Sequence, residues 1–89
     1  MSKLLPFGTF YMQGRELQGV LIACDDIINV SFELPDPVFG FKKCTIEMPN
    51  LVIKTREGFS DEEMRWIVSL CKDNKRSIEK IAKDGIIYA

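Results

Sequence analysis

The residues of this chain that could do chemistry are its carboxylates, thiols and cations, because the sequence contains no histidine. Histidine is the usual general base at neutral pH and the commonest metal ligand. Its absence excludes a Ser-His-Asp triad and a Cys-His pair. The six glycines are scattered and form neither a phosphate-binding loop nor a dinucleotide-binding motif. We therefore predict no catalytic residues and a protein that is not an enzyme.

Three cysteines are the candidate nucleophiles and soft metal ligands: Cys24, Cys44 and Cys71. Their odd number and wide spacing argue against a disulfide framework and indicate a reducing, cytoplasmic location. Each falls at an inward-facing position, where a thiol is a poor nucleophile. Asp25 and Asp26 are adjacent carboxylates that could hold a hard cation, but turn formation explains them as well, and more often. The sequence predicts no metal site and no cofactor.

Five cations near the end of the chain are the candidates for nucleic-acid contacts: Arg65, Lys72, Arg76, Lys80 and Lys83. At about 100° per residue they lie in one arc of a continuous helix, with Glu62 and Glu79 at its margins. Such an arc could contact phosphates, but a solvated helix face has the same pattern. The formal net charge is −1. Nucleic-acid binding is therefore the alternative function, and we expect no more than non-specific binding.

Three apolar residues on the same helix are the candidates for protein contacts: Trp66, Leu70 and Ile81. Trp66 projects about 120° from the centre of the apolar stripe, and Leu70 and Ile81 lie between it and that centre. The resulting arc is nearly twice as wide as the stripe of about 100° that a helix on a sheet requires. An exposed Trp beside Leu is typical of an interface, most simply of a homodimer. The alternative is that residues 86–88 fold back over this margin.

The elements that position these side chains follow from one change in hydrophobic period, at residues 58–60. Before this point apolar residues recur at every second position, and after it they recur every three to four, as in strands and a helix respectively. Five strands are predicted, at residues 7–13, 17–24, 28–34, 41–48 and 51–55. Residues 86–88 could add a last edge strand or pack as a tail.

The predicted connections follow from turn chemistry. Gly14 at the first central position of residues 13–16 indicates a type II′ hairpin turn. Asp25 and Asp26 form the next tight turn. Residues 35–37 contain two prolines and are expected to leave the sheet, because proline cannot donate to a ladder. A turn at residues 48–51 would have proline at its second position and Asn50 at its third.

The helix start is the most sharply defined local signal. Ser60 and Glu63 form a capping box, and Phe59 and Met64 occupy the positions of a hydrophobic staple. The helix is expected to run from about residue 61 to 83, with Gly85 as its stop. Asn74 lies within its apolar stripe, so a break there into two helices is the alternative. Such a break would invite comparison with a helix-turn-helix, but Lys72 stands where that motif requires glycine.

The whole sequence of 89 residues predicts a single α+β domain. We expect a curled, mostly antiparallel sheet of four to six strands with the C-terminal helix packed on one face. No apolar run approaches the roughly 18–20 residues that span a bilayer, so no membrane association is expected. The function we predict is a small non-enzymatic protein-interaction or regulatory module that acts through the apolar margin of its helix.

Overall fold

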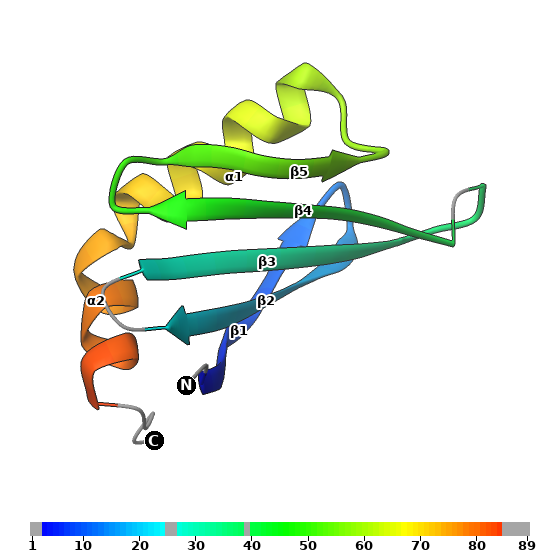
Figure 1. The fold of residues 1–89 in the computed structure, drawn as a ribbon. Coiled ribbons are helices and arrows are strands. Elements are labelled where there is room, and N and C mark those ends of the chain that lie inside the picture. Colours follow the sequence, from blue (N-terminus) through cyan, green and yellow to red (C-terminus); the bar gives the residue numbers. More distant parts are fainter. Residues whose placement is uncertain (1–2, 25–26, 39, 85–89) are drawn as a thin grey trace.

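A computed structural model describes residues 3–24, 27–38 and 40–84 of the chain. Five strands form one antiparallel sheet in sequence order: β1 (Lys3–Met12), β2 (Arg15–Cys24), β3 (Ile27–Asp36), β4 (Gly40–Met48) and β5 (Val52–Glu57). Two helices follow, α1 (Asp61–Asp73) and α2 (Lys75–Asp84). Figure 1 shows α1 behind β4 and β5, with α2 continuing past one end of the sheet. The predicted α+β fold with a curled antiparallel sheet is confirmed.

The hydrophobic core lies between the helices and one face of the sheet. Leu21, Val30 and Ile46 are paired across β2, β3 and β4, and none of the three is accessible to solvent. The helices contribute Ile67 and Ile78, which are equally inaccessible. The strict alternation along β3 explains this arrangement, because every second side chain points to the same face.

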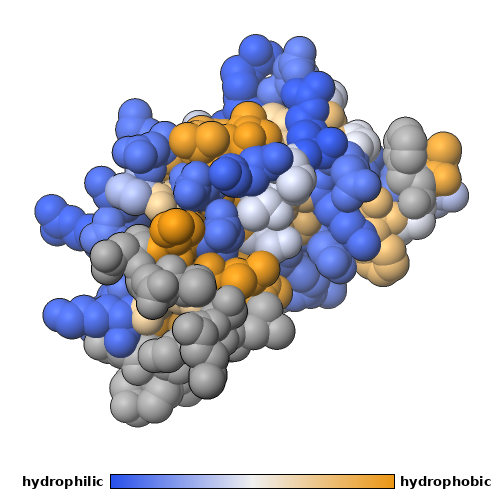
Figure 2. Space-filling model, viewed as in Figure 1, coloured by the Kyte–Doolittle hydropathy of each residue, from blue (hydrophilic) through white to orange (hydrophobic). Residues whose placement is uncertain are grey.

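The opposite face of the sheet is mainly polar. Its cross-strand rows include Glu33 opposite Lys43 opposite Glu57, and Ser31 opposite Thr45 opposite Thr55. Figure 2 views this face and shows separate apolar islands within a mostly hydrophilic surface. Ile27 and Val52, at 50% and 45% exposure, are apolar residues of this face. Isolated exposed apolar residues are ordinary on a protein surface, so this face does not by itself indicate a binding site.

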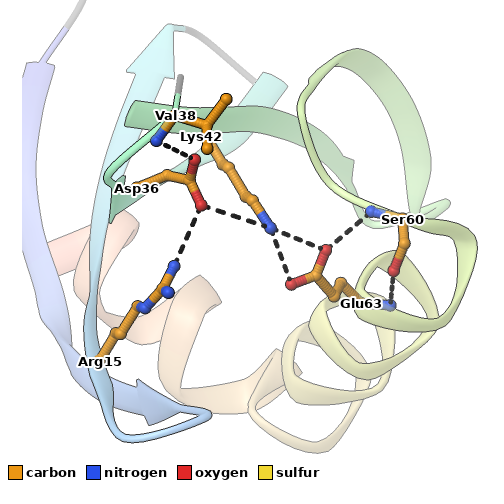
Figure 3. A network of polar contacts seen from close by, with 6 residues as sticks. All are labelled: Arg15, Asp36, Val38, Lys42, Ser60 and Glu63. Carbon is orange, nitrogen blue, oxygen red and sulfur yellow. Dashed lines mark hydrogen bonds and ion pairs between the residues drawn. The ribbon is translucent and has the colours of Figure 1, made fainter. Parts of the chain in front are cut away.

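The hairpin between β1 and β2 differs from its prediction. Met12 pairs with Arg15, so Gln13 and Gly14 are the central residues, and their φ angles are 53° and 75°. Two positive φ angles define a type I′ turn, which matches the right-handed twist of the flanking strands. The predicted turn was therefore wrong in its type, and its two central residues were placed one position too late in the sequence. The shift makes Arg15 the first residue of β2, and its side chain points toward Asp36 at the end of β3 (Figure 3).

All five strands are longer than predicted, and β1 and β3 are extended most. β1 begins at Lys3, and β3 continues through Pro35 to Asp36, which pairs with Gly40. The expectation that residues 35–37 leave the sheet was wrong for Pro35 and Asp36, which remain in β3, whereas Pro37 lies in the turn. Pairing of β3 with β2 ends at Glu33. Beyond that point β3 is paired on one side only, and proline is tolerated at such an edge.

A turn follows β4 at residues 49–51, as predicted, and the positive φ angle in it belongs to Leu51, at 58°. The turn expected at Asp25 and Asp26 lies outside the described residues. The tail beyond residue 84, including Gly85 and the segment 86–88, lies outside them as well.

The helical segment is broken at Asn74, so the two-helix alternative is confirmed and the continuous helix is wrong. The Asn74 side-chain Nδ2 donates to the backbone oxygen of Leu70 at 2.8 Å, and its backbone N–H donates to the same oxygen at 3.1 Å. These bonds satisfy a carbonyl at the end of α1, as a helix terminus requires. The backbone oxygen of Asn74 accepts a hydrogen bond from the N–H of Ile78 at 2.9 Å. This bond lies at the start of α2.

Candidate functional site

The first turn of α1 is held by its cap. The Ser60 hydroxyl accepts a hydrogen bond from the Glu63 N–H at 3.1 Å, and the Ser60 N–H donates to Glu63 Oε1 at 2.8 Å. This is the predicted capping box. Phe59 and Met64, at the staple positions, are 3% and 2% exposed. The cap fixes the direction in which the side chains of the first turn project.

Glu63 also joins α1 to the sheet through Lys42 of β4, as Figure 3 shows. The Lys42 Nζ lies 3.3 Å from both carboxylate oxygens of Glu63 and 3.9 Å from Oδ1 of Asp36. Gly58 allows this approach: its φ is +86°, and a Cβ there would lie 2.9 Å from the Lys42 Cγ. The ammonium group therefore bridges β3 and α1.

The network continues from Asp36 to the first hairpin. Arg15 donates to Asp36 Oδ1 at 3.0 Å, and the backbone N–H of Val38 donates to Oδ2 at 2.9 Å. Arg15, Asp36, Lys42 and Glu63 thus alternate in charge along one chain of contacts (Figure 3). Burial raises the pKa of Glu63, but hydrogen bonds from the Ser60 backbone and from Lys42 outweigh it and hold that pKa below its usual value. The network therefore connects β2, β3 and β4 to the first turn of α1.

A cleft of about 280 Å³ opens beside this network, between the β1–β2 turn and the first turns of α1. Its lining includes Tyr11, Met12 and Gln13 from the hairpin and Glu62, Glu63 and Trp66 from the helix. Tyr11 and Trp66 are 66% and 42% exposed, whereas Met12 is buried. The cleft therefore has two exposed aromatic side chains on its walls.

The acidic residues of the first turn differ in their partners. Asp61 pairs with Arg56 of β5, which lowers the pKa of Asp61 through a hydrogen bond and through its charge. Glu63 is held by Lys42 and Ser60. Glu62 is exposed and makes no hydrogen bond or ion pair with any described residue. Its carboxylate lies in the lining of the cleft and has no bonding partner among the described residues.

The structure separates the three predicted anchors. Trp66 lies on the cleft, while Leu70 and Ile81 are half-buried, pack against the core and are not part of the cleft lining. Tyr11 was not predicted as a partner of Trp66. Its alternation with Met12 was a signal that it points away from the core, but no local pattern shows that the hairpin lies beside α1.

The five predicted cationic residues are all exposed. The break at Asn74 divides them between two helices: Arg65 and Lys72 on α1, and Arg76, Lys80 and Lys83 on α2. The single arc assumed a continuous helix, and its geometry does not apply to a broken one. The structure therefore does not align the five cations along one helix.

Cys44 and Cys71 are free and buried, as their inward positions predicted, while the side chain of Cys24 lies outside the described part. Burial raises the pKa of the Cys71 thiol to about 12. Burial, with a smaller effect of the nearby Cys71, raises the pKa of Cys44 to about 12. Thiols with such pKa values carry almost no thiolate at neutral pH and are poor nucleophiles.

Comparisons of the chain with protein-family models, curated proteins and solved structures found no match. Within the described residues, no cluster of three or more potential metal-ligating side chains is present. None of the helices described here is long and apolar enough to cross a membrane.

Proposed function

We propose that the chain is a small non-enzymatic protein-interaction or regulatory module that binds its partner at the cleft between Tyr11 and Trp66. The observation that carries this proposal is the exposure of both aromatic side chains, 66% and 42%, on the walls of one cleft. Tyr and Trp are enriched in interface hot spots, because each offers a large apolar area together with one polar group. Such a cleft can receive a side chain of a protein partner.

The elements that form the cleft are joined by ion pairs and hydrogen bonds, which supports this proposal. The type I′ turn orients the hairpin that carries Tyr11, and the capping box orients the helix that carries Trp66. The contacts from Arg15 through Asp36 and Lys42 to Glu63 connect the two sides. A preformed site loses less conformational entropy on binding than a flexible one.

The surface we propose differs from the one expected from the sequence. Leu70 lies one turn beyond Trp66 on α1, so any exposed part of it extends the same wall along the helix. Ile81 lies on α2, and it would join the interface only with a partner that spans both helices. Trp66 and Tyr11 are therefore the anchors, and Leu70 is a flanking contact.

We place this module in the cytoplasm, and a second copy of the chain is its simplest partner. The cytoplasmic location is supported by the odd number of cysteines and by the free thiols of Cys44 and Cys71. A homodimer is supported by the exposed position of Trp66 in the isolated chain. The nucleic-acid alternative has less support, because its cations lie on two separate helices.

Capture experiments with matched variants test this function. Immobilised wild-type protein is compared with Trp66→Ala and Tyr11→Ala, and with Phe41→Ala as the control, since Phe41 is 52% exposed and is not in the cleft lining. We expect proteins that are retained by the wild type and by Phe41→Ala to be lost from both cleft variants. Identical retention by all four proteins would contradict the proposal.

A further inference from the structure

The charges on the cleft walls are unbalanced. Glu63 is compensated by Lys42, whose Nζ lies 3.3 Å from both of its carboxylate oxygens. Glu62 has no such partner, and no lysine or arginine is part of the cleft lining within the described residues. The cleft therefore combines one uncompensated carboxylate with the exposed rings of Tyr11 and Trp66.

We infer that the cleft binds the cationic side chain of an arginine in the partner protein, with Glu62 as its counter-ion and Tyr11 and Trp66 as its aromatic walls. This inference rests on the proposed function and specifies the chemistry of the partner. A guanidinium group is attracted to the negative faces of aromatic rings. It also donates several hydrogen bonds in one plane, which suits a carboxylate.

A cation fits this cleft better than an anion. The positive end of the α1 dipole, equivalent to roughly half a unit charge, would by itself favour an anion. Glu62 contributes a full negative charge at the same place, and the N–H of Glu63 is already bonded to Ser60. An anion would also meet the carboxylate of Glu63. The walls are thus complementary to a positive charge.

Arginine fits better than lysine because of its shape. Its planar group can stack on one ring while its N–H groups reach a carboxylate at the side, whereas the lysine ammonium is a compact and strongly hydrated charge. Gln13 also lines the cleft and adds a side-chain oxygen that can accept a further hydrogen bond. The buried Met12 supplies an apolar floor for the methylene groups of the arginine.

The single tryptophan of the chain makes this inference directly testable, because its fluorescence reports on the cleft. Short, otherwise identical peptides carrying arginine, lysine, citrulline or glutamate at one position are titrated against the full chain. We expect a saturable fluorescence change with the arginine peptide. The neutral citrulline peptide should bind about two- to fivefold more weakly, as expected for loss of an exposed cation–aromatic contact.

Variants assign the binding to the cleft. Glu62→Gln should weaken arginine-peptide binding by about two- to fivefold, the size of an exposed ion pair. Glu79→Gln removes the same charge from an exposed position on α2 and should change nothing. Equal binding of the arginine, citrulline and glutamate peptides would overturn the inference. Loss of captured proteins from Trp66→Ala would then still support the proposed function, so the two can fail separately.

Discussion

At the scale of single residues, Lys42 joins β3 to α1 because its one ammonium group contacts two carboxylates. Its side chain is 14% exposed, and those of Asp36 and Glu63 are 10% and 9% exposed. A charge so little exposed to water is costly unless it is paired. Removal of Lys42 would leave two acids with one fewer partner, so its loss should cost more than loss of a surface lysine.

We predict that Lys42→Met lowers the free energy of unfolding by about 1–3 kcal/mol at pH 7, the usual cost of leaving a buried polar group without its partner. The folded-state pKa of Glu63 lies below its ordinary value of 4.5. Its stabilisation is therefore present above that value and is lost as the pH falls through the folded-state pKa. The difference between variant and wild type should shrink in acid, which denaturant titrations at several pH values would show.

The matched control is Lys43→Met, which changes the neighbouring, exposed lysine on the polar face of the sheet. Lys43→Met should change the free energy of unfolding by no more than about 0.5 kcal/mol, as most surface substitutions do. Equal effects of the two substitutions would mean that the Lys42 contacts contribute no special stability.

At the scale of elements, the two ends of α1 are both set by side chains that bond to the backbone. Ser60 accepts from the Glu63 N–H at the start, and Asn74 donates to the Leu70 oxygen at the end. Both contacts join residues that are only three or four positions apart in the sequence. The cap also sets where Glu62 and Trp66 project from the first turns of α1.

We predict that Ser60→Ala destabilises the protein by about 0.5–2 kcal/mol, the usual cost of removing an N-cap side chain. Ser69→Ala is the control, because Ser69 is exposed within the same helix and alanine is a better helix former. Thermal melts of the two variants would show the difference. A melting temperature unchanged by Ser60→Ala would mean that the capping contact is not made in solution.

At the scale of the whole molecule, the exposed aromatic side chains lie at two places on the surface. Tyr11 and Trp66 share the cleft, whereas Phe41 lies on β4, outside the cleft lining. Specific protein interfaces bury roughly 800 Å² on each partner. The cleft can therefore be the anchor of an interface, and flanking surface such as Leu70 must supply the remaining area.

We predict that the purified chain is a homodimer and that Trp66→Glu converts it to a folded monomer. Trp66 is already 42% exposed in the isolated chain, so a charged residue there should disturb association more than folding. Phe41→Glu places the same charge at another exposed aromatic position and should leave the dimer intact. Light scattering gives the masses, and circular dichroism reports folding. A monomeric wild type would end the homodimer proposal and leave a different protein as partner.

Features that depend on neighbouring residues could be predicted from the sequence. The alternation along β3 predicted its buried face, and Ser60 with Glu63 predicted the start of α1, because strand periodicity and capping act over a few positions. The position of Asn74 in the apolar stripe indicated a break as the alternative, but the sequence did not decide between one helix and two. The choice between one helix and two depends on how each packs against the core, which lies beyond a local pattern.

The position of the candidate site could not be predicted from the sequence, because it depends on how distant elements pack together. The cleft is lined by both Tyr11 of β1 and Trp66 of α1, which are far apart in the sequence. They come together because of the strand order in the sheet and the position of α1 against it. The chain of contacts from Arg15 to Glu63 likewise depends on the type I′ turn and on the extension of β3 to Asp36. A shift of one residue in a hairpin moves side chains to the opposite face, so such juxtapositions exist only once the register is set.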